Sequence, residues 1–385
     1  MLKKFFIIAG EASGDLLGSK LIKELKIQNP QNHDSQFIGV GGKLMKEQGL
    51  ISIFPMEELS IMGFAEIVPH IPKLLRRIRE TADKIISEKP DFVITIDSPD
   101  FCFRVIKKIE KEKVKKVHMI APSVWAYRPK RAEKISKLYD LLLAILPFEP
   151  PYFEKHGLKT VFIGHPITEN APDFSKKEAA NLQFRKEHFV AANDLLICIT
   201  PGSRNGEVKK IFPEFIGAIN LLIEKFPNLK VAIPLVDKTR GLVFEMAKTL
   251  KTEYFLIEKE EKNSAFFASN FALAKSGTNA LELSLYHLPL IIAYKINFIT
   301  HFIVKSLVKI KFANLINLIL NKELIPEMLQ DNCNAQAIAS NLERLILDKN
   351  LAQKQIAESE IALKLMGLGS NENPSQKAAA QILKL

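Results

Sequence analysis

The fold is decided by two stretches of sequence, FFIIAGEASGD at residues 5–15 and LLICITPGSRNG at residues 195–206. Each begins with an apolar run that is typical of a buried strand, continues into a loop that contains glycine, and leads into an amphipathic helical pattern. Strand and helix patterns alternate after both stretches, and this alternation predicts parallel, doubly wound sheets. We therefore expect an α/β protein in which two tandem Rossmann-like domains face a cleft.

Apolar runs place the expected strands along both halves of the chain. In the first half they are Phe5–Ala9, Phe37–Val40, Phe92–Ile96, Val114–Ile120, Leu141–Leu146 and Val161–Ile163. In the second half they are Leu195–Ile199, Lys230–Pro234, Phe255–Ile257, Phe271–Ala274 and Leu290–Ala293. Prolines and polar residues cluster at 164–175 and predict the boundary there. We expect a first domain over 1–170, a second over 171–345, and a helical tail over 346–385 that could pack back on the first domain.

Composition excludes several classes of protein. With 47% hydrophobic and 25% charged residues in a chain of 385, the sequence is typical of globular proteins and not of disordered ones. Its three cysteines lie far apart, which argues against a disulfide framework or a zinc site and favours a reducing cytoplasm. The apolar run after Lys3 and Lys4 is too short for a signal peptide, and no run reaches the roughly 18 apolar residues of a membrane span. We expect a soluble protein or one that touches membranes only at their surface.

The charge of the chain favours anionic partners. The formal net charge is +11, from 54 Lys and Arg against 43 Asp and Glu. Such an excess suits nucleic acids, acidic lipid surfaces or phosphorylated substrates. Nucleic-acid binding would need a clustered basic face with stacking aromatics or a known binding motif, and the sequence has none. We therefore expect no nucleic-acid partner.

Two acidic positions follow predicted strands in the first half. Ligands of open α/β sheets bind at the carboxyl ends of the strands, so Glu11 and Asp97 are candidates for chemistry. Asp97 either acts as a base in a desolvated setting or caps a helix, and Asp100 competes with it. The loop at residues 10–15 lacks the dinucleotide and P-loop patterns, and Ser13 or Asp15 could cap the following helix. The only tryptophan, Trp125, also follows a strand, where it either stacks on a sugar or packs in the core.

Two loops of the second half predict a pocket for a nucleotide diphosphate. Gly202, Ser203 and Arg204 lie where a strand meets the start of a helix, and backbone N–H groups there attract anions. A guanidinium adds a positive group with the geometry that phosphate needs. The other loop, at residues 276–278, also precedes a helix, and Glu282 one turn later could accept ribose hydroxyls. No histidine or cysteine pattern predicts a metal site.

Residues 64–79 combine an apolar stripe with a basic edge. Such a stretch either lies on a membrane surface or packs on the core with its basic side in solvent. Pro69 and Pro72 interrupt the helical spacing, so we do not expect one regular helix. Residues 298–312 have the same character.

Taken in order, these motifs resemble the family of lipid-A-disaccharide synthases. The first half carries AGEASGD (9–15), GVGG (39–42), MG (62–63), IDSPDF (96–101), PSVWA (122–126), LPFE (146–149) and FIGH (162–165). The second half carries PGSR (201–204), SGT (276–278), LE (281–282), NL (317–318) and EL (323–324). The resemblance runs from about residue 7 to residue 335.

The resemblance implies a glycosyltransferase fold of the B type and an inverting transfer that uses no metal and no cofactor. The donor would be UDP-2,3-diacylglucosamine and the acceptor 2,3-diacylglucosamine 1-phosphate. The products would be the β-1′,6-linked lipid A disaccharide 1-phosphate and UDP. The resemblance also implies attachment to the inner face of the cytoplasmic membrane through about residues 64–79, and it allows a homodimer.

Site residues follow from the same resemblance. Asp97 would be the general base on the acceptor hydroxyl, and the further active-site residues would be Glu11, Ser13 and Asn317. The residues that hold UDP would be Gly202, Ser203, Arg204, Ser276, Gly277, Thr278 and Glu282. Two enzyme classes with the same expected fold stay open as alternatives: an N-acetylglucosamine transferase of cell-wall synthesis and a UDP-N-acetylglucosamine 2-epimerase.

Overall fold

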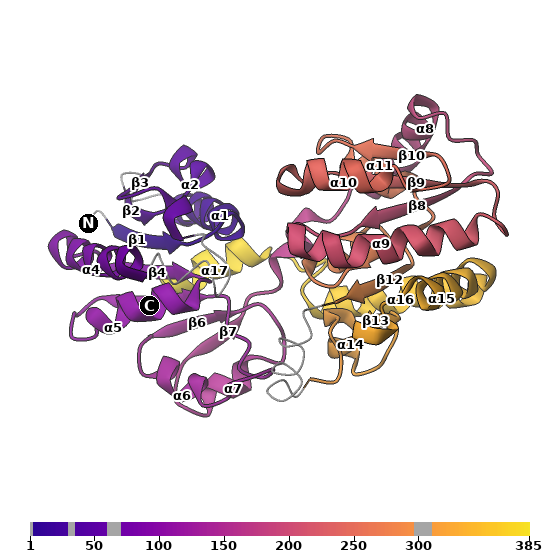
Figure 1. The fold of residues 1–385 in the computed structure, drawn as a ribbon. Helices are drawn as coiled ribbons and strands as arrows, with labels where there is room; N and C mark the ends of the chain where they lie inside the picture. The colour runs from indigo at the N-terminus through magenta and orange to yellow at the C-terminus, as the bar shows by residue number, and fades with distance from the viewer. Residues whose placement is uncertain (1–2, 30–34, 60–70, 296–309) are drawn as a thin grey trace. The chain divides into compact units, whose positions relative to one another are not determined.

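Two parallel sheets organise the chain (Figure 1). The computed structural model describes residues 3–29, 35–59, 71–295 and 310–385. The chain divides into two compact units, an N-terminal unit of residues 1–169 and 369–385 and a C-terminal unit of residues 170–368. Helices cover both faces of the sheet in each unit, as Figure 1 shows. The expected α/β class with two Rossmann-like domains in tandem is confirmed.

The N-terminal unit has, among its described residues, a seven-stranded parallel sheet in the order β3-β2-β1-β4-β5-β6-β7. Its strands are β1 (Lys4–Ala9), β2 (Gln36–Val40), β3 (Leu50–Ser52), β4 (Phe92–Ile96), β5 (Lys115–Met119), β6 (Leu141–Ala144) and β7 (Thr160–Phe162). Its helices are α1 (Ala12–Gln28), α2 (Lys43–Glu47), η2 (Met56–Leu59), α4 (Ile71–Glu88), α5 (Pro99–Lys108), α6 (Arg131–Ser136), α7 (Pro150–Glu154) and α17 (Pro374–Leu383).

The C-terminal unit has, within the part that is described, a six-stranded parallel sheet in the order β10-β9-β8-β11-β12-β13. Its strands are β8 (Leu195–Thr200), β9 (Leu229–Pro234), β10 (Tyr254–Ile257), β11 (Phe271–Lys275), β12 (Leu290–Tyr294) and β13 (Glu327–Leu329). Its α-helices are α8 (Lys177–Glu187), α9 (Asn205–Leu222), α10 (Arg240–Ala247), α11 (Lys262–Ala268), α12 (Thr278–Leu285), α14 (Leu315–Leu320), α15 (Ala335–Leu347) and α16 (Lys349–Leu365). Short 3₁₀-helices are η4 (Pro166–Asn170), which spans the unit boundary, η5 (Phe174–Lys176), η6 (Asp237–Thr239) and η7 (Gln330–Asn332).

Each sheet reverses its strand order beside its first strand. In the N-terminal unit the chain moves outward from β1 to β2 and β3 and then returns to β4 on the other side of β1. In the C-terminal unit it moves from β8 to β9 and β10 and then returns to β11. Loops diverge at such a switch point and leave room for a ligand at the carboxyl ends of the two strands. The fold therefore directs attention to the loops after β1 and β4 and after β8 and β11.

The central strands are apolar on both faces because helices cover both sides of a parallel sheet. In β1, residues 5–9 are all buried, and the Phe5 ring stacks between Phe37 and Phe92 of the two neighbouring strands. Asp15, which follows this strand, is buried and does not cap its own helix. Its carboxylate accepts hydrogen bonds from the backbone N–H groups of Gly42, Leu44 and Met45 and thereby caps α2.

The structure adds two strands that the sequence analysis did not predict. These are β3 and β13, each three residues long and each at the edge of its sheet. A three-residue edge strand is too short to show an alternating or continuous apolar pattern. Both therefore extend the sheets without changing which strands lie at the switch points.

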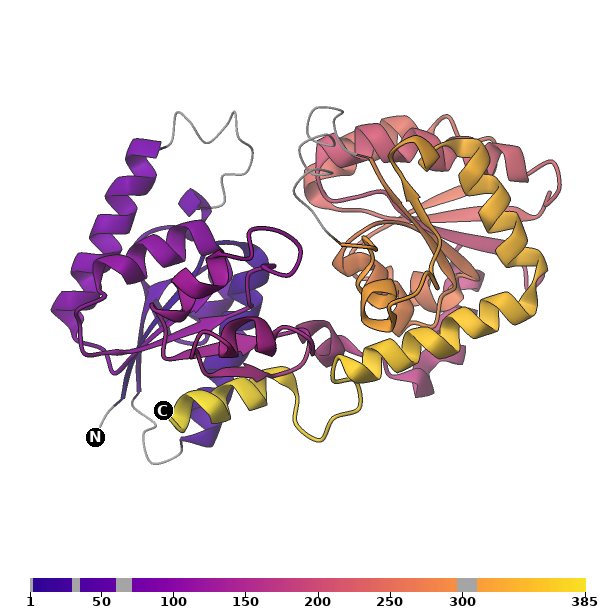
Figure 2. The same ribbon diagram turned by 90° about the horizontal axis from the view of Figure 1, so that it is seen from below.

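The C-terminal segment is divided between the two units. The helix α16 belongs to the C-terminal unit, where the buried Gln355 side chain bonds both backbone groups of Leu290. The helix α17 belongs to the N-terminal unit and packs on α1, with Ala378, Ala379 and Ile382 in the core. Figure 2 shows the yellow α17 beside the indigo and purple elements of that unit.

Candidate active site

The switch point of the N-terminal sheet brings two loops into direct contact. Gly10 follows β1 and Ser98 follows β4, and a Cβ atom on Gly10 would lie only 2.1 Å from Ser98 Oγ. Only glycine allows this approach. Asp97 and Ser98 both have left-handed backbone, with φ of 51° and 45°. Such conformations are uncommon for residues with side chains and persist where the surroundings hold them, often at functional sites.

Three of the predicted site residues meet at this point. The Ser13 hydroxyl donates a hydrogen bond to Glu11 Oε1 at 2.6 Å. Burial of the half-buried Asp97 carboxyl raises its pKa above the usual range, and the negative charge of Glu11 raises it further, against a lowering by the Ser98 backbone N–H. Glu11 and Asp97 are therefore electrostatically coupled. A carboxylate with a raised pKa is a stronger base than a free aspartate.

Asp100, the competing candidate, has a different environment. Its side chain is 84% exposed, and Oδ1 lies 2.5 Å from the Arg131 guanidinium in an ion pair. Asp100 is thus solvent-exposed and engaged by a cation, whereas Asp97 is half-buried. The choice of Asp97 as the base stays a prediction.

Glu149 is a buried carboxyl group at the same sheet edge to which the sequence analysis gave no role. It is 1% exposed, and burial raises its pKa to about 7. The backbone N–H groups of Ile145 and Leu146 donate to Oε2, and Trp125 Nε1–H donates to Oε1 at 3.2 Å. The Trp125 ring also meets Phe148 edge to face. Glu149 thus fixes the side chain of Trp125, the only tryptophan of the sequence. The sequence pointed to Glu149 only through its place in the LPFE motif.

The C-terminal unit has a pocket at its own switch point, with a volume of about 400 Å³. Its walls come from the loops after β8, β9 and β11 and from the starts of α9, α11 and α12. Gly202 and Gly277 turn these loops with φ of 129° and 143°, values that favour glycine. All seven predicted UDP residues line this one pocket, namely Gly202, Ser203, Arg204, Ser276, Gly277, Thr278 and Glu282.

Charged side chains concentrate in this pocket. The cations that line it are Arg204, Lys262 and Lys275, and the acids are Glu207 and Glu282. Glu282 Oε1 lies 2.6 Å from Lys262 Nζ, while Glu207 Oε1 lies 3.0 Å from Lys275 Nζ. Arg204 precedes α9 and Gly277 precedes α12, so two helix N-termini face the same space. Both features suit a phosphorylated ligand.

Asn317 does not lie in either of these places. Its side chain is fully buried in α14, where Nδ2 donates to Ile325 O and Glu327 Oε1. Its Oδ1 accepts from the backbone N–H groups of Leu324 and Ile325. All the hydrogen-bonding capacity of the amide is used within the protein. The amide therefore holds residues 317–327 together, and the assignment of Asn317 to the active site stays a prediction that rests on the resemblance.

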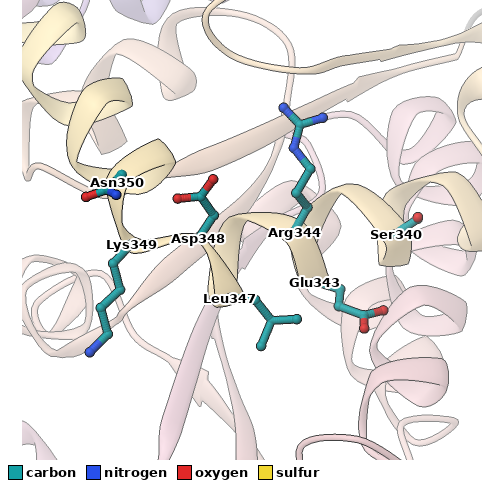
Figure 3. A pocket seen from close by; sticks show the side chains of 7 residues that line it. All are labelled: Ser340, Glu343, Arg344, Leu347, Asp348, Lys349 and Asn350. Carbon is teal, nitrogen blue, oxygen red and sulfur yellow. The ribbon is translucent and has the colours of Figure 1, made fainter.

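A second hollow lies at the corner between α15 and α16 (Figure 3). Figure 3 shows the Arg344 side chain of α15 pointing away from the side chains of Leu347, at the end of α15, and Lys349, at the start of α16. Here Glu343 pairs with Lys225 and Asp348 caps α16, so both acids already have structural partners. The hollow is lined by residues of one continuous stretch, 340–350, and by none of the residues that the sequence analysis assigned to a site.

One Rossmann-like unit has coupled carboxylates at its switch point, and the other has a pocket with three cations at its own. This pairing is typical of the fold of B-type glycosyltransferases. A family model described as lipid-A-disaccharide synthetase matches residues 5–382. The chain belongs to this family. The lipid-A-disaccharide synthase of Rickettsia canadensis (strain McKiel) is 42% identical over 100% of this chain and 97% of that protein. That of Rhodospirillum centenum is 39% identical over 99% of this chain and 94% of that protein.

Solved structures with the same fold align over nearly the whole chain at low sequence identity. A UDP complex of S. aureus MnaA aligns with a TM-score of 0.61 at 17% identity, over 99% of this chain and 95% of that one. Acinetobacter baumannii MurG aligns with a TM-score of 0.60 at 12% identity, over 100% of both chains. At such identities the likeness concerns the fold alone. The family match decides among the enzyme classes that share the fold.

Proposed function

We propose that this glycosyltransferase activates its acceptor in the N-terminal unit and holds the UDP of its donor in the C-terminal unit. The reaction joins UDP-2,3-diacylglucosamine to 2,3-diacylglucosamine 1-phosphate. A bond forms between the acceptor 6-oxygen and C1 of the donor sugar, while the bond from C1 to UDP breaks. The hydroxyl proton passes to a base, and the bonding electrons leave with UDP. Such a transfer needs one base and one cationic site for the leaving group.

The half-buried carboxylate of Asp97 is the observation that carries this proposal. It follows β4 at the switch point, and both burial and Glu11 raise its pKa. In the proposed mechanism Asp97 takes the proton from the acceptor hydroxyl. Ser13 and Glu11 form a second hydrogen-bonding pair beside it. This pair keeps a negative charge near Asp97 and thereby maintains its basicity.

The leaving group is assigned to the pocket of the C-terminal unit. The N-termini of α9 and α12 offer backbone N–H groups to the diphosphate, and Arg204 adds a charge-assisted hydrogen bond. Glu282 lies one turn into α12 and is placed to accept the ribose hydroxyls, with Lys262 holding its carboxylate. Fixed dipoles and cations of this kind stabilise the charge that develops on UDP.

Two matched variants test the base. Asp97→Asn keeps the size of the side chain and removes its basicity, so we expect UDP release in the presence of both lipid precursors to fall roughly 10²–10⁴-fold. Asp100→Asn changes the exposed neighbour and should leave the rate within about threefold of the unmodified enzyme. Near-normal turnover of Asp97→Asn would overturn the assignment of the base.

We further propose that the beginning of α4 contacts an anionic membrane surface. Ile71 and Leu75 are 43% and 49% exposed, Leu74 is half-buried, and Arg76 and Arg79 are exposed beside them. Pro72 stands in the first turn of α4, where proline is compatible with a regular helix, so the irregularity expected here is absent from residue 71 onward. Residues 64–70 and 298–309 of the expected membrane segments lie outside the described residues.

Part of the expected basic edge is used within the protein. Lys73 and Arg77 both pair with Glu58, and Arg77 also lies over the Phe54 ring. Arg76 and Arg79 are therefore the residues we assign to the lipid surface, where each basic side chain contributes about 1 kcal/mol. Among the described residues, no helix has the length and hydropathy of a membrane span.

Vesicle sedimentation tests the surface. The full-length protein should bind vesicles that contain phosphatidylglycerol, and binding should weaken as salt rises. The double substitution Ile71→Ser and Leu75→Ser should reduce binding, because it removes the exposed apolar side chains. Leu182→Ser with Ile361→Ser changes equally exposed side chains of the C-terminal unit and serves as the control. Equal binding by the two double variants would contradict the proposal.

A further inference from the structure

We propose that Lys275 is a diphosphate-binding residue and that Glu207 is its built-in counterion, which the diphosphate displaces. This inference rests on the proposed function, since it assumes that the pocket of the C-terminal unit takes UDP. Lys275 is the last residue of β11 and lines the pocket. Its Nζ atom would be 3.6 Å from a Cβ atom on Gly277, so the ammonium points at the turn that begins α12.

The ammonium group of Lys275 is held in place by its surroundings. Its Nζ atom lies 5.3 Å from the centre of the Tyr294 ring, and the side chain is only 21% exposed. A lysine fixed in this way loses little further freedom when it binds an anion. The ammonium therefore stands ready between Tyr294 and the Gly277 turn, at the switch point where the phosphates are expected.

Glu207 occupies the place that an anionic ligand would take. Its Oε1 lies 3.0 Å from Lys275 Nζ and 3.5 Å from Arg204 Nη1, so one oxygen serves both cations. Its Oε2 is buried and has no hydrogen-bond partner among the described residues. A buried carboxylate oxygen without a donor is costly, and its retention here is explained by the two cations that the carboxylate neutralises.

The contacts of Glu207 with Arg204 and Lys275 are explained if the diphosphate takes the place of the Glu207 carboxylate when the donor binds. Before the donor binds, Glu207 balances Arg204 and Lys275. A diphosphate carries more charge and more acceptor oxygens than a carboxylate, so it competes for both cations and frees Glu207 from them. Opposite effects follow for the two members of the pair: loss of Lys275 weakens nucleotide binding, whereas loss of the Glu207 charge strengthens it.

Calorimetric titration with UDP tests the exchange. Lys275→Met keeps an unbranched side chain, removes its charge and should raise the Kd for UDP roughly tenfold or more, and Lys275→Arg should restore most of the affinity. Glu207→Gln should lower the Kd about three- to tenfold. Uridine, which has no phosphate, should bind all of these variants alike, which a general structural defect would not allow.

The next strand supplies a matched control. Lys295 follows β12 and pairs with Glu214 of α9 at 2.8 Å, outside the residues that line the pocket. Lys295→Met should leave UDP binding unchanged. The inference is overturned if Lys275→Met binds UDP normally, or if Glu207→Gln weakens binding as the lysine variant does. If the unmodified protein does not bind UDP at all, the proposed function itself fails.

Discussion

The two switch points share one backbone plan and carry opposite charge. In the N-terminal sheet the loops after β1 and β4 bring together the carboxylates Glu11 and Asp97. In the C-terminal sheet the loop after β8 and the end of β11 place the cations Arg204 and Lys275 in one pocket. Glycines allow close approach in both, Gly10 in one and Gly202 in the other. The fold thus creates a binding site at each switch point, and the side chains there determine whether the site suits proton abstraction or phosphate binding.

The largest effect should come from disabling both switch points together. Asp97→Asn removes the base, and Arg204→Ala removes a cation from the nucleotide pocket. The two groups lie in different units, so their losses should add in free energy. We expect kcat/KM to fall by the product of roughly 10²–10⁴ and roughly 10–150. A double variant no slower than Asp97→Asn alone would show that the two sites act as one group.

Arg204→Ala alone should affect only nucleotide binding. Loss of a charge-assisted hydrogen bond of about 1.5–3 kcal/mol raises the Kd for UDP roughly 10–150-fold. Arg240→Ala removes an exposed arginine of the same unit, one that pairs with Glu258, and should leave the Kd unchanged. Calorimetry measures both. An unchanged Kd in Arg204→Ala would remove this residue from the phosphate site.

Much of this comparison could be predicted from the sequence, because it depends on local patterns. Apolar runs followed by glycine loops indicated the strands of both units and therefore Glu11, Asp97 and Arg204. The strand order that creates the switch points depends on long-range pairing, so it required the structure. The same limit applies to the Lys275–Glu207 pair, because Lys275 ends β11 and Glu207 lies in the first turn of α9.

Two further residues show why side-chain environments escape sequence analysis. Asn317 was assigned to the active site by the resemblance, yet its amide is fully occupied by Leu324, Ile325 and Glu327. Glu149 was given no role, yet it is a buried carboxyl group with a raised pKa. In both cases hydrogen-bond partners define the role, and the partners are fixed by the fold.

Glu149 provides a contrast to Asp97. It lies at the same edge of the N-terminal sheet, but its carboxyl group is buried and hydrogen-bonded within the protein, so we expect it to affect stability. Its pKa is about 7 in the folded protein against 4.5 in the unfolded chain, so the folded state holds more protons between these values. The free energy of unfolding should therefore fall as pH rises from about 4.5 to about 7, by on the order of 2 kcal/mol, and then level off. Glu149→Gln should lose this dependence.

Denaturant unfolding followed by the emission of Trp125, the only tryptophan, measures the effect directly. Asp100→Asn, which changes an exposed carboxylate, should retain the pH dependence of the unmodified protein. A Glu149→Gln protein whose stability still falls over the same pH range would show that another group is responsible.

The smallest effect is expected from Glu11→Gln. The negative charge of Glu11 raises the pKa of Asp97, and only the deprotonated aspartate can accept the proton. Activity is therefore lost as pH falls through the pKa of Asp97. Removing the charge of Glu11 lowers that pKa, so the acid limb of the kcat profile should move to lower pH. A limb that stays in place or moves to higher pH would contradict the coupling of the two carboxylates.

The affinity of Asp97→Asn for UDP tests the division between the two switch points most directly. Transfer by this variant is expected to be lost. Calorimetric titration then measures whether its affinity for UDP is also lost. We predict a Kd within about twofold of that of the unmodified protein, because Asp97 lies in the N-terminal unit and the described residues that line the pocket belong to the C-terminal unit. A large loss of UDP affinity would contradict the account.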